Sequence, residues 1–212
     1  MKSIILIAPP SAGKGTVSNI IKEKYNMAHI STGDLLREAA KDNLEIKETL
    51  EKGLLVTDEV VLELLKNRIT KEDCANGYIL DGFPRTISQA IAYEKILEDL
   101  KREIGCVVYL EIDKETAKKR VVGRISCPQC GAIYNEYFDK MKPQVENICD
   151  KCGTELTRRT DDNEETFNKR FDTYMEKTSP LIDYYDKLGL LNRVSSNQGS
   201  SEAALEIENL IK

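Results

Sequence analysis

Short, mostly apolar runs alternate along this chain with longer stretches in which apolar residues recur at helical spacing. The runs lie at residues 4–7, 27–30, 78–80, 105–112 and 190–194, and runs of this length and composition are typical of strands covered on both faces of a parallel sheet. Helical patterns are found at 14–25, 35–41, 86–102, 164–180 and 200–211. The alternation therefore predicts an α/β fold with helices packed on a parallel sheet.

Two stretches interrupt this alternation. Residues 43–72 read as two helices divided at Gly53 and at Thr57-Asp58, and a cluster of cysteines occupies residues 127–152. We interpret both stretches as inserts on one core, which a chain of 212 residues is long enough to build.

The first strand leads into a loop that is typical of phosphate binding. Residues 8–16 read Ala-Pro-Pro-Ser-Ala-Gly-Lys-Gly-Thr, and a helix is predicted from Lys14 to Tyr25. A helix start offers unpaired N–H groups and partial positive charge to an anion, and Lys14 adds a full charge. Ala8 and Gly15 depart from the usual pattern Gly-x-x-x-x-Gly-Lys-[Ser/Thr], so a plain strand-to-helix turn with a surface lysine is the alternative.

A second candidate site follows the strand at 78–80. Asp81 stands at the carboxyl end of that strand, where open parallel sheets place their ligands. A carboxylate there suits Mg²⁺, directly or through water. The alternative is an ordinary aspartate in a turn beside a solvated Arg85. Thr86 and Gln89 have capping-box spacing for the next helix.

Arg120 and Arg124 are four residues apart in a stretch that predicts a helix capped by Asp113. That spacing places both side chains on one helix face. The alternative is an ordinary solvated stripe.

The cysteines form two Cys-x-x-Cys pairs, Cys127 with Cys130 and Cys149 with Cys152, with eighteen residues between the pairs. Two such pairs can hold one metal ion with four thiolates in a closed, structural site. Zinc fits best and a lone iron is the second choice. The same spacing would also suit two disulfides or four free thiols, and disulfides are disfavoured in a reducing cytoplasm.

Composition limits the classes of function. The chain has 31 Lys and Arg residues against 36 Asp and Glu residues, a net charge of −5, which argues against a protein that coats nucleic acid or an anionic membrane. No apolar run approaches the roughly 20 residues of a membrane span, and no signal peptide is recognisable, so we expect a cytoplasmic location. The one histidine, His29, is expected to be structural.

Together, these motifs resemble those of the bacterial adenylate kinases of the long, zinc-lid type. The resemblance rests on residues 13–16, 31–37 and 81–86, on the four cysteines, and on Arg159-Thr160-Asp161-Asp162 with Arg170. These motifs occur in the family's order over essentially the whole chain.

The resemblance implies a P-loop three-layer sandwich with a five-stranded parallel sheet. It implies a core domain of residues 1–30, 61–124 and 163–212, a helical AMP-binding insert at 31–60, and a zinc lid at 125–162. The implied reaction is reversible, Mg²⁺-dependent transfer of the terminal phosphoryl group of ATP to AMP, giving two ADP by direct in-line transfer without a covalent enzyme intermediate. The implied protein is a monomer with structural Zn²⁺ and without nucleic-acid or membrane partners.

The resemblance also assigns residues to these roles. The ATP site would comprise Ser11, Ala12, Gly13, Lys14, Gly15, Thr16, Arg124, Ile133, Tyr134 and Gln198. The AMP site would comprise Thr32, Arg37, Leu54, Leu55, Val56, Gly82, Phe83, Pro84, Arg85, Gln89, Arg159 and Arg170. The catalytic cations would be Lys14, Arg85, Arg120, Arg124, Arg159 and Arg170. The metal ligands would be Cys127, Cys130, Cys149 and Cys152 for zinc, and Asp81, through water, for Mg²⁺.

The family usually has glycine at the positions of Ala8 and Ser11. A non-glycine residue forced to positive φ costs roughly 1–2 kcal/mol. We therefore expect negative φ at both positions.

Three other functions are weighed against this one. The nearest is a kinase for another nucleoside monophosphate, or one that uses GTP as donor. A nucleic-acid-binding ATPase is disfavoured because residues 131–148, between the cysteine pairs, carry a net charge of −1 where a basic face is needed. A structural zinc protein would leave Lys14 and Asp81 unexplained.

Overall fold

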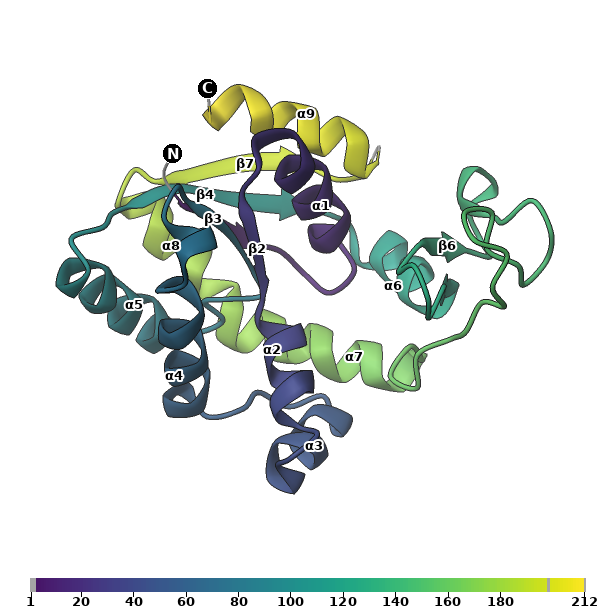
Figure 1. Ribbon diagram of the computed structural model, residues 1–212, viewed down its shortest axis with the longest axis horizontal. Coiled ribbons are helices and arrows are strands. Elements are labelled where there is room, and N and C mark those ends of the chain that lie inside the picture. The colour runs from purple at the N-terminus through teal and green to yellow at the C-terminus, as the bar shows by residue number, and fades with distance from the viewer. Residues whose placement is uncertain (1–2, 198, 212) are drawn as a thin grey trace.

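A five-stranded parallel sheet forms the centre of the molecule (Figure 1). The computed structural model describes residues 3–197 and 199–211. The strand order is β2-β3-β1-β4-β7, and all four neighbouring pairs are parallel. The strands are β1 (Ser3–Ile7), β2 (Ala28–Ser31), β3 (Tyr78–Asp81), β4 (Ile104–Glu111) and β7 (Leu191–Ser195). The predicted five-stranded parallel sheet is confirmed.

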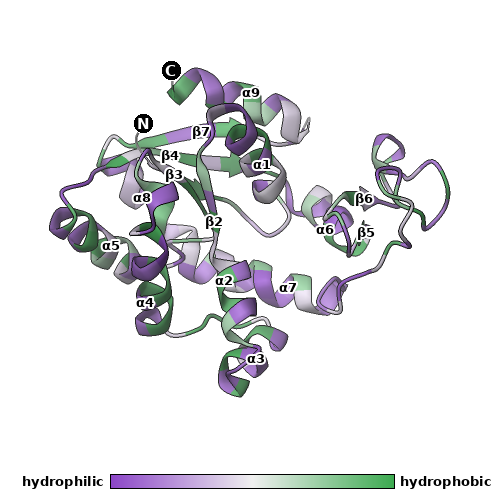
Figure 2. Ribbon diagram, in the orientation of Figure 1, coloured by the Kyte–Doolittle hydropathy of each residue, from purple (hydrophilic) through white to green (hydrophobic). Residues whose placement is uncertain are grey.

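Helices cover both faces of this sheet, because successive side chains of a strand point to opposite faces. Ile4 and Leu6 of β1 pack with α1 (Lys14–Tyr25) and α9 (Ser200–Ile211) in one apolar cluster. Ile5 and Ile7 pack in a second cluster with α4 (Asp58–Ile69), α5 (Ile87–Asp99) and α8 (Pro180–Lys187). Figure 2 shows hydrophobic and hydrophilic stripes along outer helices such as α4 and α9. The result is the predicted three-layer α/β sandwich.

Side-chain caps begin most of the remaining helices. Ser31 accepts a hydrogen bond from the Asp34 N–H at the start of α2 (Thr32–Ala39), and Thr86 does the same for Gln89 at α5. Asp113 caps α6 (Lys114–Val122) in the same manner. The helix starts predicted at these residues are confirmed. Two further helices, α3 (Leu44–Glu51) and α7 (Glu164–Thr173), are capped by asparagines.

Helices α2 and α3 stand away from the central sheet, at the bottom of the view in Figure 1, whereas α4 packs against the sheet. Gly53, at φ +71°, ends the turn after α3, and α4 begins at Asp58. The predicted division into two helices is confirmed. Later in the chain, a π-helical turn (Tyr174–Thr178) joins α7 to α8.

The four-cysteine segment, residues 124–162, lies to one side of the central sheet (Figure 1). It holds a two-stranded antiparallel sheet of β5 (Arg124–Ser126) and β6 (Ile133–Asn135). Its small core contains Ile125, Tyr134 and Leu156 together with Cys127 and Cys149. This core is separate from the two clusters that cover the central sheet.

The structure corrects one prediction about this segment. Helix α6 ends at Val122, so Arg124 begins β5 and does not share a helix face with Arg120. The reason is a set of bonds from the four-cysteine segment to the last carbonyls of α6: the Asn135 Nδ2 donates to Arg120 O at 3.0 Å, and the Glu136 N–H donates to Gly123 O at 2.9 Å. The helix therefore stops where distant residues satisfy its carboxyl end.

Among the residues that the structure describes, no helix combines the length and apolarity needed to cross a membrane.

Candidate functional site

The loop between β1 and α1 presents the start of α1 without a capping side chain. Gly13 occupies the N-cap position at φ +89°, and the cap makes no side-chain hydrogen bond to the helix among the described residues. Lys14 folds back and donates from Nζ to the carbonyl oxygens of Ala8 and Pro9, both at 3.2 Å. Such an arrangement of exposed N–H groups and a positive side chain is suited to an anion.

One expectation about this loop is wrong. Ser11 has φ +59°, in the left-handed region, whereas Ala8 is not among the positive-φ residues, as expected. A left-handed residue between Pro10 and Ala12 turns the chain back toward the helix start, which bends the backbone N–H groups around one concavity. Ser11 therefore adopts the conformation for which glycine is the usual residue.

Asp81 lies beside this loop at the end of β3, paired in register with Leu6 of β1. A Cβ atom added at Gly15 would lie 3.8 Å from the Asp81 Oδ2. His29, on β2, places Nε2 3.6 Å from the same oxygen. A carboxylate oxygen at the edge of a phosphate-type loop is the kind of ligand that Mg²⁺ or its water shell accepts, so the residues present fit that ion.

Positive charges gather around Lys14. Burial lowers the pKa of Lys14 to about 8, with Asp81 opposing the shift and Arg85, Arg170 and Arg124 adding to it. Burial also lowers the pKa of Arg85 to about 10, again with Arg170 adding to the shift. The lowered pKa values at both groups reflect burial first, and the neighbouring arginines add to the shift while Asp81 opposes it. A bound polyanion would supply further negative charge that opposes it.

Three further arginines are held by aspartates in this structure. Arg37 of α2 bonds to Asp34. Arg170 of α7 donates from Nη1 to Asp161 Oδ2 at 3.0 Å. Arg124 donates from Nε to Oδ2 of the buried Asp162 at 2.7 Å and forms a second bond through Nη2. These carboxylates orient the guanidinium groups, and two of the three arginines, Arg37 and Arg170, line the cavity described below.

Arg120 has an unpartnered donor next to the phosphate-type loop. Its Nη2 donates to Ser196 O at 2.9 Å, whereas its Nη1 is buried and has no hydrogen-bond partner among the described residues. That Nη1 lies 4.0 Å from the position of a Cβ added at Gly13. A buried donor without a partner costs free energy, and a phosphate oxygen in the loop would satisfy it.

A cavity of about 870 Å³ extends from the α2–α4 segment to Lys14. Its volume is in the range typical of small-molecule sites. All residues predicted for the AMP site line it except Phe83, which is buried against Tyr93 with ring centroids 5.4 Å apart. The lining residues from that prediction are Thr32, Arg37, Leu54, Leu55, Val56, Gly82, Pro84, Arg85, Gln89, Arg159 and Arg170.

The residues predicted for the ATP site are less closely gathered. Of the loop residues 11–16, Lys14 alone lines the cavity. Ile133 is exposed, and the Tyr134 side chain is buried in the four-cysteine core, where its hydroxyl accepts from the Asp150 N–H at 2.8 Å. Tyr134 can therefore offer a nucleotide its backbone but not its ring. Gln198 lies outside the described residues.

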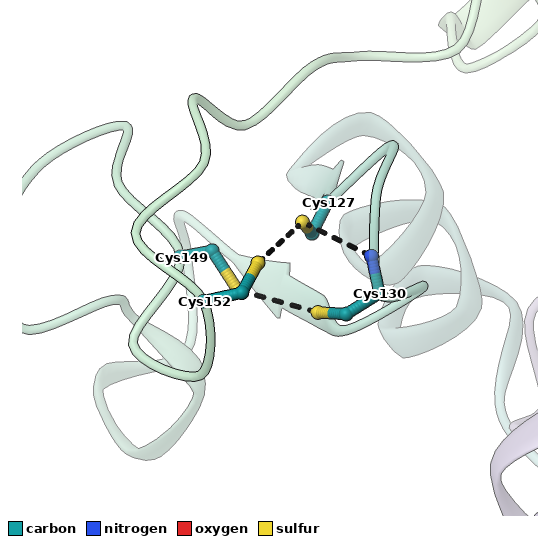
Figure 3. Close-up of side chains that lie close together, drawn as sticks. All are labelled: Cys127, Cys130, Cys149 and Cys152. Atoms are coloured by element: carbon teal, nitrogen blue, oxygen red, sulfur yellow. Dashed lines mark hydrogen bonds between the residues drawn. The ribbon is translucent and has the colours of Figure 1, made fainter.

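The four cysteines converge on one point (Figure 3). Their sulfur atoms all lie within 4.8 Å of one another, with Cys127 and Cys152 at 3.4 Å and Cys130 and Cys149 at 3.5 Å. All four are free thiols, so a pair of disulfides does not describe this structure. Zn–S bonds of about 2.3 Å in a tetrahedron separate the sulfurs by about 3.8 Å. The cluster therefore fits one tetrahedral metal ion.

Sequence reasoning missed Asp58, the first residue of α4. Its Oδ1 accepts a hydrogen bond from Gln89 Nε2 at 2.7 Å, and the Arg85 N–H donates to Gln89 Oε1 at 2.8 Å. The sequence does not mark Asp58 as a site residue, because the helix dipole alone explains an acidic residue in the first turn of a helix.

Comparisons with known proteins identify the family of this chain. A family model described as Adenylate kinase matches residues 6–190. An adenylate kinase of Caldicellulosiruptor bescii is 48% identical over 192 residues, covering 89% of this chain and 88% of that one. Adenylate kinases of Bacillus cereus and Acetivibrio thermocellus are each 43% identical, and the matches cover 99% and 98% of this chain and 98% and 97% of theirs.

Proposed function

Because this chain belongs to the adenylate kinase family and is a nucleoside monophosphate kinase, we propose that it transfers the terminal phosphoryl group of Mg²⁺-ATP to AMP. The products are two molecules of ADP, and the reaction is reversible. Transfer is direct and in line, without a covalent enzyme intermediate.

The observation that carries this proposal is the crowding of cations at one end of the cavity. Lys14 and Arg85 are buried there with lowered pKa values, and each lies close enough to Arg170 for the charges to interact. Phosphoryl transfer needs positioning and charge compensation more than covalent chemistry. A site built of cations, with a carboxylate at its edge, matches those needs.

Each group has a role in this proposal. The cavity binds AMP, and the start of α1 with Lys14 binds the phosphates of ATP. Arg120, Arg124 and Arg159 join the phosphates where the two nucleotides meet, together with Arg85 and Arg170. Asp81 would hold Mg²⁺ through water, and the bound ion would supply positive charge to the transferring group.

The four-cysteine segment has the role of a lid in this proposal. Residues 125–162 close over ATP and exclude water, and residues 31–60 close over AMP, while residues 1–30, 61–124 and 163–212 form the core. Water exclusion matters because bound ATP would otherwise be hydrolysed. Structural Zn²⁺ in the cysteine cluster stiffens the lid, and the protein acts as a cytoplasmic monomer.

An acceptor panel tests the proposed reaction. ADP formation is measured with ATP and, separately, AMP, CMP, UMP and GMP, and then with GTP in place of ATP. ATP with AMP should give by far the highest kcat/KM. A higher value with another acceptor, or with GTP, would replace AMP or ATP in the proposal.

Two substitutions test the role of the cation cluster. Lys14→Ala and Arg85→Ala should each lower kcat by orders of magnitude, since each removes charge that stabilises the transition state. The control is Arg193→Ala, which removes an exposed arginine that pairs with Glu111 on β4. Near-normal kcat in either cluster variant would refute the roles assigned here.

A further inference from the structure

The Gln89 side-chain amide is held from both sides. Its Nε2 donates to Asp58 Oδ1 at 2.7 Å, and its Oε1 accepts from the Arg85 backbone N–H at 2.8 Å. The residue is 2% exposed and lines the cavity, whereas Asp58 is not among the lining residues. Asp58 therefore contacts the amide from the side away from the cavity.

These two contacts fix which way the amide faces. An ionised carboxylate only accepts hydrogen bonds and a peptide N–H only donates. If the amide turned over, its oxygen would face the Asp58 carboxylate and its NH₂ group would face the Arg85 N–H. Without such partners, a glutamine amide presents its oxygen and its nitrogen interchangeably.

The carboxylate is itself held in place. Ser88 donates from Oγ to Asp58 Oδ2 at 2.5 Å, and Thr86 donates from Oγ1 to the same oxygen at 3.4 Å. Oδ1 is left for Gln89. These bonds join the first turn of α4 to the first turn of α5. The two contacts that hold the Gln89 amide, from Asp58 and from the Arg85 N–H, are called the clamp below, and the Asp58 side of it is part of the packing between the two helices.

The clamp leaves Gln89 with one free N–H and one free lone pair. On its N1 and C6 edge, a 6-aminopurine offers a ring-nitrogen acceptor beside an amino donor. A 6-oxopurine offers the reverse, an N1–H donor beside an oxygen acceptor. An amide that can turn over pairs with either base, whereas an amide of fixed orientation can match only one of the two patterns in a given pose.

We propose that Asp58 is a positioning residue that sets the selectivity of this cavity for 6-aminopurine over 6-oxopurine nucleoside monophosphates. This inference rests on the proposed function, in which the cavity binds AMP, and it adds that the base of AMP lies against Gln89, a lining residue of that cavity. Asp58 acts through Gln89 and does not touch the nucleotide.

The test compares AMP with IMP, which differ at the C6 and N1 positions alone. Asp58→Asn keeps the shape of the side chain but offers an N–H that can pair with an overturned Gln89 oxygen. The ratio of kcat/KM for AMP to that for IMP should fall several-fold rather than vanish, because the Arg85 N–H still favours the native orientation of the amide. The fall should lie in KM, with a rise for AMP and a decrease for IMP, because the transferring phosphates are unaffected.

The matched control is Glu59→Gln, which removes the same charge from the same helical turn at an exposed position. It should leave the AMP to IMP ratio unchanged. Ser88→Ala is a milder variant that keeps the carboxylate but removes its 2.5 Å bond, and it should lower the ratio by a smaller factor even if Asp58→Asn folds poorly.

An unchanged ratio in both Asp58→Asn and Ser88→Ala would overturn the inference, as would an equal fall in Glu59→Gln. Failure of the proposed function is distinguishable from either result. It would appear as a wild-type protein that does not phosphorylate AMP in preference to other acceptors, before any variant is compared.

Discussion

Lys14 combines two opposing demands. It must be charged to bind phosphate, yet its buried position disfavours the charge, and burial is the largest cause of its lowered pKa. Arg85, Arg170 and Arg124 lower that pKa further, and Asp81 alone among the interacting groups raises it. Bound polyphosphate would reverse this balance, because its negative charge favours the protonated amine.

We therefore expect kcat/KM for ATP to fall as the pH rises through about 8, the pKa of Lys14. This quantity reports the free enzyme, in which Lys14 loses its proton above that pH, whereas kcat should fall only at a higher pH because it reports the complex. Measuring kcat and kcat/KM for ATP between pH 6 and 10 would test both expectations. A value of kcat/KM that does not change with pH would contradict the first.

The same lowered pKa has a consequence for folding. The unfolded chain holds the Lys14 proton up to the ordinary value of 10.5, whereas the folded chain loses it near 8. The unfolded state thus binds more protons between these values, so the contribution of this group to stability increases with pH across that window.

Ser11 carries backbone strain that glycine would relieve. Its φ of +59° costs a non-glycine residue roughly 1–2 kcal/mol, while glycine adds about 0.4–1 kcal/mol of unfolded-state entropy cost. Ser11→Gly should therefore raise the free energy of unfolding by up to about 1.6 kcal/mol, with activity retained. Denaturant titration would measure this, and Ser195→Gly, on an extended strand, should lose stability instead.

Among the helices, features set by neighbouring residues could be predicted and features set by distant ones could not. The caps at Ser31, Thr86 and Asp113 follow from residues three positions away, and all three are present. The end of α6 depends on hydrogen bonds from Asn135 and Glu136. These residues lie beyond the helix in the sequence, so the pattern of the helix itself does not predict where it ends.

The same limit applies to the candidate site. The phosphate-type loop and the cysteine pairs are contiguous in sequence, so they could be recognised from the chain alone. The left-handed Ser11 and the clamp between Asp58 and Gln89 depend on how the loop turns and how α4 packs against α5. No local pattern encodes those contacts.

The cysteine cluster should bind one Zn²⁺ per chain, and removing the metal should lower the melting temperature of the four-cysteine segment. The reason is that this segment has a small core of its own, and two of its buried members are metal-ligand candidates, Cys127 and Cys149. Elemental analysis and calorimetry with and without chelator would measure both effects.

Two substitutions separate the cluster from the other thiols. Cys130→Ser should abolish zinc binding, while Cys106→Ser, which removes a half-buried thiol on β4, should retain it. A metal-free, fully folded wild-type protein would contradict the prediction.

Across the whole molecule, the cations of the site come from parts of the chain that are far apart in sequence. Lys14 begins α1, Arg85 follows β3, and Arg170 is in α7. Arg124 is at the root of the four-cysteine segment, where its pair with the buried Asp162 joins the two ends of that segment. Lys14, Arg85 and Arg170 are therefore brought together by the core, and the four-cysteine segment adds Arg124 to them.

The geometry of that root allows the four-cysteine segment to be replaced. Ser126 and Thr157 exchange two backbone hydrogen bonds, each 2.8 Å long, which is the pairing that closes a two-residue hairpin. Replacing residues 127–156 with Asn-Gly should leave a folded core, because the small core of this segment is separate from the two clusters that cover the central sheet. The end of α6 loses its bonds from Asn135 and Glu136, and the cavity lining contains no residue from the replaced range. AMP binding should be retained, whereas KM for ATP should rise and some ATP should be hydrolysed to ADP and phosphate, since less of the site is closed to water.

Measuring phosphate release together with ADP formation distinguishes hydrolysis of ATP from phosphoryl transfer to AMP. Unchanged KM for ATP with no phosphate release would show that the segment neither binds the donor nor excludes water.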